Sequence, residues 1–157
     1  MVRLCELVRC PEKHAGAITV AGWIKTARAS KTIGFIELTD GSCFKTVQVV
    51  YEQDQVNDET KRALNTGCAI SVQGELLLTP DAPQPFEIHA ASIVIEGECP
   101  GDYPLQKKRH SLEYLRTIQH LRPRTNTFQA TFRVRSVVAQ AIHRFLSLIH
   151  ISEPTRP

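Results

Sequence analysis

Residues 17–97 contain segments in which apolar and polar side chains alternate in a way that is typical of β-strands, with one helical segment among them. Strands are expected at 17–29, in a hairpin over 34–52, and at 68–80 and 86–97. The helix is expected at 57–67, which starts with Asn-Asp and ends at a glycine. Three strands, a helix and two strands is the order of the OB-fold, a five-stranded Greek-key barrel. We therefore predict an all-β OB-fold over residues 1–98, although SH3-like barrels and other small β folds share much of this pattern.

Glycines interrupt two of the expected strands, Gly22 in the first and Gly74 in the fourth. A glycine inside a strand often marks a bulge or a sharp bend, which a small barrel needs in order to close. The hairpin is expected to reverse at Asp40-Gly41-Ser42, a typical turn composition.

Alternation in the hairpin predicts one buried and one polar face. The buried face is expected to hold Ile36, Leu38, Val47 and Val49, and the polar face Phe35, Glu37, Thr46 and Gln48. The phenylalanine is out of place on a polar face. It either packs under a loop as a small hydrophobic contact or is exposed for a purpose.

An exposed ring has a clear use on an OB barrel, because single-stranded nucleic acid binds across the second and third strands and bases stack on aromatic side chains. Gln48 carries a donor and an acceptor with which to read a base edge. Arg28, at the end of the first strand, can hold a phosphate or a base edge. Glu87, at the start of the fifth strand, can accept from a base amino or imino group.

After Cys99 the composition changes. Residues 99–125 are expected to form a linker that contains the basic run Lys107-Lys108-Arg109 and a helical stretch, 111–121, with Ser111 as its cap. A longer helix is expected at 126–146. Its apolar stripe consists of Val134, Val138, Ile142 and Phe145.

Charge is divided unevenly between these two parts. Residues 1–98 contain nine Lys and Arg against 13 Asp and Glu, whereas residues 99–157 contain ten against three. The expected barrel is therefore not a general polyanion binder, and any non-specific affinity has to come mainly from the second part.

The five cysteines and six histidines form no CxxC pair and no cluster with zinc-ligand spacing. We expect free thiols and no metal site. No apolar run reaches membrane-spanning length, and the N-terminus lacks the apolar segment of a signal peptide. These features predict a cytoplasmic protein without membrane association.

Two stretches resemble a known family. "GWIKTARASKTIGFIELTDGSCFKTVQVV" (22–50) is similar to the anticodon-binding domain of the class IIb aminoacyl-tRNA synthetases. "YPLQKKRHSLEYLRTIQHLRPRTNTFQATFRVRS" (103–136) resembles the asparaginyl-tRNA synthetases within that class, most of all in the string HLRPRTN at 120–126. The resemblance covers about residues 15–146.

The resemblance implies roles for matching residues. Phe35 matches the aromatic residue that stacks on the central uridine of the anticodon, and Gln48 matches the glutamine that hydrogen-bonds this base. Glu87 and Arg28 match residues that contact the anticodon. A second arginine of aspartyl relatives is Thr26 here. The run Lys107–Arg109 lies in the family's hinge, close to the tRNA body.

The resemblance also implies the activity of the longer family enzyme, which joins asparagine to tRNA(Asn) with ATP and Mg²⁺ and is a homodimer. Residues 126–146 match the start of the motif 1 helix at the dimer interface of an incomplete class II α+β catalytic domain. Motifs 2 and 3 have no counterpart, and 147–157 does not resemble the expected continuation, so we expect a non-native tail and a fragment that is inactive alone. The alternatives are a stand-alone single-strand-binding OB module, a fragment of an aspartyl or lysyl relative, and a purely structural interaction domain.

Overall fold

The computed structural model describes residues 1–80, 82 and 84–149. The chain consists of two compact units, one from Met1 to Arg109 and a second that begins at His110. This division falls inside the segment 99–125 that was expected as a linker.

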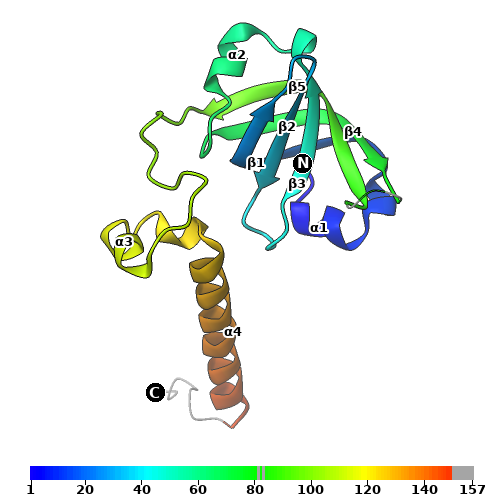
Figure 1. Ribbon diagram of the computed structural model, residues 1–157. Coiled ribbons are helices and arrows are strands. Elements are labelled where there is room, and N and C mark those ends of the chain that lie inside the picture. Colours follow the sequence, from blue (N-terminus) through cyan, green and yellow to red (C-terminus); the bar gives the residue numbers. More distant parts are fainter. Residues whose placement is uncertain (81, 83, 150–157) are drawn as a thin grey trace, which may run out of the picture. The chain divides into compact units, whose positions relative to one another are not determined.

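The first unit is built on five strands: β1 (Gly16–Ala29), β2 (Ile33–Thr39), β3 (Val47–Glu52), β4 (Ala69–Leu78) and β5 (Phe86–Gly97). They form a closed barrel in the order β1-β2-β3-β5-β4 (Figure 1). β3 and β5 run parallel, whereas the other neighbours are antiparallel. The predicted five-stranded OB-fold barrel is confirmed.

The helix between the third and fourth strands is α2 (Asp58–Ala63), after the 3-10 turn η2 (Gln53–Gln55). Its cap is Asn57, whose side chain accepts a hydrogen bond from the Thr60 N–H at 2.7 Å. The helix is thus shorter than the expected 57–67, although Gly67 adopts the left-handed backbone (φ 93°) in the turn that leads to β4.

Both interrupting glycines lie where two backbones come close, and each strand is irregular nearby. A Cβ on Gly22 would come within 2.5 Å of the Thr39 carbonyl oxygen. The bulge in β1 lies between Ile24 and Thr26, shortly after Gly22, where a bulge or a sharp bend was expected. At Gly74, the β4–β5 register shifts between Gln73 and Gly74.

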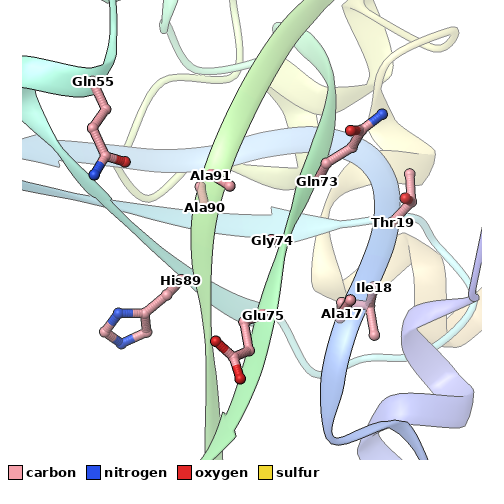
Figure 2. Close-up of a pocket in the computed structure, with 10 residues that line it drawn as sticks. All are labelled: Ala17, Ile18, Thr19, Gln55, Gln73, Gly74, Glu75, His89, Ala90 and Ala91. Carbon is pink, nitrogen blue, oxygen red and sulfur yellow. The ribbon is translucent and has the colours of Figure 1, made fainter.

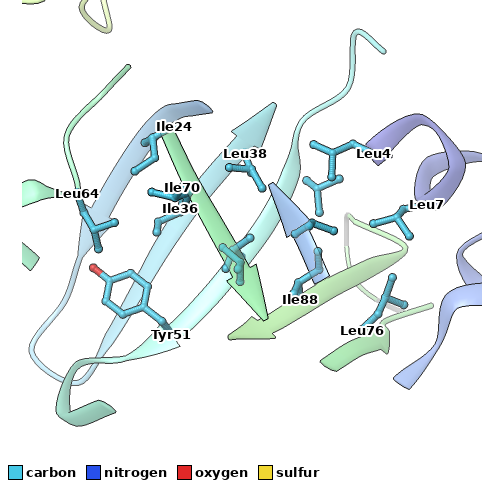
Figure 3. Close-up of a cluster of buried hydrophobic side chains, with 14 of the residues drawn as sticks. Leu4, Leu7, Ile24, Ile36, Leu38, Tyr51, Leu64, Ile70, Leu76 and Ile88 are labelled. Atoms are coloured by element: carbon cyan, nitrogen blue, oxygen red, sulfur yellow. The ribbon is translucent and has the colours of Figure 1, made fainter. Parts of the chain in front are cut away.

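The barrel interior is filled by inward-facing aliphatic side chains (Figure 3). All four residues predicted for the buried face of the hairpin are at most 1% exposed: Ile36, Leu38, Val47 and Val49. Leu64, which follows α2, contributes to the same core. Leu4 and Leu7 join this core from a helix that the sequence analysis did not predict.

That helix is α1 (Leu4–Arg9), which is followed by the 3-10 turn η1 (Pro11–His14). The β2–β3 turn caps it: the Leu4 N–H donates to Asp40 Oδ2 at 2.9 Å, and the Cys5 N–H donates to Ser42 Oγ at 3.0 Å. These are two of the N–H groups that no helix satisfies internally. The cap therefore joins the N-terminal segment to the barrel.

The pKa of Asp40 reflects this arrangement. Partial burial raises the pKa, but hydrogen bonds from Ser42 and from the Leu4 N–H outweigh burial and hold it below its usual value. A carboxyl with a lowered folded-state pKa stabilises the fold above its unfolded pKa of about 3.9, and this contribution disappears as the pH falls through the folded pKa.

We expect Asp40→Asn to reduce the free energy of unfolding at pH 7 by about 1–2 kcal/mol, because a charged acceptor of three hydrogen bonds is lost. The difference from the unsubstituted chain should shrink below pH 4. Urea denaturation between pH 3 and 7 measures both effects. Asp58→Asn, on exposed α2, is the control and should change little. A pH-independent difference would contradict the role of the Asp40 charge.

The second unit contains α3 (Leu112–Thr117), the 3-10 turn η3 (Arg122–Arg124) and α4 (Asn126–Leu148). The predicted Ser111 cap accepts from the Tyr114 N–H at 3.2 Å, but α3 ends at Thr117 and not near Pro123 as expected. α4 extends two residues beyond the predicted 126–146, into the expected tail 147–157, of which 150–157 lie outside the described residues. The expected stripe is at least 50% exposed at each position: Val134, Val138, Ile142 and Phe145.

No helix in the described part of the chain combines the length and the apolar character needed to span a membrane.

Candidate nucleic-acid interface

Phe35 lies on the outer face of β2 and is 39% exposed. Its neighbour Ile36 points into the core, so alternation turns the ring outward. On the other side, Gly34 is paired with Tyr51, whose ring lies against the Gly34 backbone, where a Cβ would collide with it. Phe35 is therefore held on a closely packed part of the strand while its ring remains accessible.

Arg28 lies directly opposite Phe35 in the β1–β2 pair. Its Nη2 is 3.3 Å from Oε1 of Glu37, which is two residues further along β2. Both side chains are substantially exposed, at 65% and 31%. Such a surface pair contributes about 0–1 kcal/mol, so the guanidinium can exchange Glu37 for an RNA phosphate or base at small cost.

Gln48 lies on β3 opposite Glu37 and diagonal to Phe35. Diagonal neighbours in an antiparallel pair are about 7–8 Å apart, a span that one base can cover. The Gln48 Nε2 donates to Glu87 Oε1 at 2.8 Å. Gln84, in the β4–β5 loop, donates from its Nε2 to the Gln48 Oε1 at 3.2 Å.

The structure thus brings Phe35, Arg28, Gln48 and Glu87 together on one outer face of β1, β2, β3 and β5. The Lys107–Arg109 run is exposed at the end of the first unit. Alternation placed Glu37 on this side of the hairpin, but its pairing with Arg28 was not expected. The contact of Gln84 with Gln48 was missed, and no local signal in the sequence indicates it.

A separate depression of about 810 Å³ lies over β1, β4 and β5 (Figure 2). None of the four predicted site residues lines this depression. Glu75 and His89, a register pair on β4 and β5, lie on its wall. Its other lining residues are Ala17, Ile18, Thr19, Gln55, Gln73, Gly74, Ala90 and Ala91.

Within the described residues, no three His, Cys, Asp or Glu side chains are grouped so that they could hold a metal ion. None of the five cysteines, all of which lie in the described residues, forms a disulfide. Burial raises the pKa of the Cys68 thiol, with a smaller contribution from the neighbouring Cys99. The outer face that carries Phe35 offers base stacking, hydrogen bonding and charge interactions.

The barrel matches a known domain family. Residues 18–96, half of the chain, match the family profile of the OB-fold nucleic acid binding domain. The chain belongs to this family. The matched residues include all four predicted site residues, which together form the Phe35 face: Arg28, Phe35, Gln48 and Glu87.

The chain is also similar to full-length proteins that contain such a domain. It is 60% identical over 128 residues to an asparagine–tRNA ligase of Desulfitobacterium hafniense and 57% identical over 141 residues to one of Alkaliphilus oremlandii. These matches cover 82% and 89% of the chain but span about 30% of the length of the two relatives. The resemblance to the asparaginyl branch that residues 103–136 predicted is confirmed.

Solved structures show the same fold. The asparaginyl-tRNA synthetase of Pyrococcus horikoshii, complexed with asparaginyl-adenylate, superimposes with a TM-score of 0.77 at 23% identity and covers 92% of the chain and 33% of its own length. The aspartyl-tRNA synthetase of Entamoeba histolytica reaches 0.75 at 18% identity and covers 99% and 39%. At these identities the similarity shows a shared fold.

Proposed function

We propose that this chain is the anticodon-binding part of an asparagine–tRNA ligase and that the face around Phe35 binds the anticodon loop of tRNA(Asn). The ring stacks on the central uridine. The Gln48 amide hydrogen-bonds the edge of that base, while Arg28 and Glu87 contact the anticodon nearby. The basic run at 107–109 contacts the tRNA body.

One observation carries this proposal: an exposed phenylalanine has an arginine directly across the strand pair and a glutamine amide on the diagonal. Stacking contributes about 1–3 kcal/mol per base but does not distinguish among bases. Discrimination requires a polar group beside the ring, and Gln48 is in that position. The names of the relatives in the comparison support tRNA as the ligand.

In the complete enzyme, ATP and Mg²⁺ serve the activation of asparagine before its transfer to tRNA. We assign the described residues to tRNA recognition, and the activation chemistry to the rest of the longer enzyme. We propose that residues 1–157 do not catalyse the reaction by themselves. We also propose that the protein acts in the cytoplasm. The exposed apolar stripe of α4 is suited to the homodimer interface of a class II enzyme.

The test is titration of the 157-residue chain with two labelled anticodon stem-loops that differ in the central base, uridine or cytidine, at one stated salt concentration. We expect the uridine loop to bind about tenfold more tightly, since a mismatched edge loses about one to two net hydrogen bonds. Equal affinities would contradict decoding and favour the alternative, a general single-strand-binding OB module.

A further inference from the structure

The carboxamide of Gln48 is held at both of its polar atoms. Its nitrogen donates to Glu87 at 2.8 Å, and its oxygen accepts from Gln84 at 3.2 Å. The three side chains come from β3, the β4–β5 loop and β5. They form a short hydrogen-bonded chain that runs from Gln84 through Gln48 to Glu87.

This chain has one possible direction. A carboxylate only accepts hydrogen bonds, so the group that Gln48 turns toward Glu87 must be its NH₂. The Gln48 oxygen then faces Gln84, which must in turn present its own NH₂. The negative charge of Glu87 thus determines the orientation of two amides.

The backbone holds Gln84 in place independently of RNA. The Thr79 hydroxyl donates to the Gln84 carbonyl oxygen at 2.7 Å, and the Thr79 N–H donates to the Pro85 carbonyl oxygen at 2.9 Å. Both bonds close the base of the loop beside β4 and β5. Gln84 is therefore supported from the barrel.

Orientation of the Gln48 amide matters for discrimination between pyrimidines. Uracil presents a carbonyl oxygen beside an N–H donor, whereas cytosine presents an amino donor beside a nitrogen acceptor. An amide that rotates freely can match either edge by exchanging its oxygen and nitrogen. An amide held in one orientation retains one free N–H and one free lone pair in a defined order, and matches one edge.

We propose that Gln84 is a positioning residue for base discrimination, which keeps the Gln48 amide in the orientation that selects uracil. This inference rests on the proposed function, because it presupposes that the Phe35 face binds an anticodon base. Gln84 acts through Gln48 and does not itself contact the base.

The experiment measures the ratio of affinities for the uridine and cytidine stem-loops in variants of the 157-residue chain. Gln84→Ala removes the donor, and Gln84→Glu replaces it with an acceptor that opposes the Gln48 oxygen. Both are expected to lower the preference for uridine about fivefold or more, the effect of about one hydrogen bond. Gln73→Glu, at an exposed position of β4, makes the same charge change and should keep the preference.

A double-mutant cycle separates positioning from direct contact. In a Gln48→Ala background, Gln84→Ala is expected to leave the remaining preference unchanged. A further loss there would overturn the positioning role, and an unchanged preference in both single variants would do so as well. Circular dichroism melts test whether each variant is folded. If Gln84→Glu unfolds, the test rests on the affinity ratio of Gln84→Ala. If the unsubstituted chain shows no preference for uridine, the proposed function fails and the role of Gln84 fails with it.

Discussion

Replacing Phe35 with alanine is expected to weaken binding of the uridine-centred anticodon stem-loop by about 5- to 150-fold. This range corresponds to the 1–3 kcal/mol of one base stacked on an aromatic ring. The ring is 39% exposed and lies outside the core, so the variant should fold and melt close to the unsubstituted chain. Fluorescence anisotropy titration measures the affinity, and a thermal melt followed by circular dichroism measures the stability.

Phe44→Ala is the matched control. Phe44 is 52% exposed in the β2–β3 turn, beyond the opposite end of β2 from Phe35. It should leave the affinity for the stem-loop nearly unchanged. Phe35→Trp should retain binding, because indole offers an equally flat surface. Equal affinities of the Phe35→Ala and unsubstituted chains would show that the RNA does not stack at this position.

Gly74→Ala is expected to destabilise the barrel by about 3 kcal/mol, the upper part of the usual range for inserting a methyl group where there is no room. The added Cβ would lie 2.1 Å from the His89 carbonyl oxygen and 2.9 Å from the Ala90 Cα. Both are backbone atoms of the paired strand, so relief requires β4 and β5 to separate and their hydrogen bonds to lengthen. Urea denaturation followed by circular dichroism measures the loss.

Gly101→Ala supplies the comparison within the same chain, because a Cβ there meets nothing within 4 Å. That variant should unfold at the same urea concentration as the unsubstituted chain or slightly above it, since alanine restricts the unfolded state. If both variants had the same midpoint, the close approach of β4 and β5 at Gly74 would not exist.

The parts of the fold that could be predicted are those in which local pattern and tertiary burial agree. Alternation identified Ile36 and Leu38 as core residues, and both are fully buried. Strand β5 spans 86–97 as expected. Asn57 caps α2 through a hydrogen bond with Thr60, three residues away. Because the two partners are so close in the sequence, such a cap can be predicted from the sequence.

The helix α1 could not be predicted in this way. It has six residues and no side-chain cap of its own, so it has little intrinsic stability. Its caps are Asp40 and Ser42, more than 30 residues away. For α3, the Ser111 cap was predicted correctly from the sequence, but the early end of the helix at Thr117 was not.

The candidate site divides along the same line. Alternation placed the Phe35 ring on the outer face of the hairpin. The resemblance of residues 22–50 to a known family implied that the ring stacks on a base. Neither indicated the pairing of Arg28 with Glu37 or the contact of Gln84 with Gln48. Loop residue Gln84 has no periodic pattern around it, so its position depends on how the barrel closes.

The sequence by itself determined which residues form strands and which side of each strand faces the core, because side-chain alternation and burial are properties of a single strand. The tertiary structure decided which strands are neighbours. Parallel pairing of β3 with β5 brings Gln48 within 2.8 Å of Glu87, across 39 residues of sequence. That contact exists because the two ends of the sheet must meet to satisfy their edge hydrogen bonds, a requirement of the closed barrel that no single segment contains.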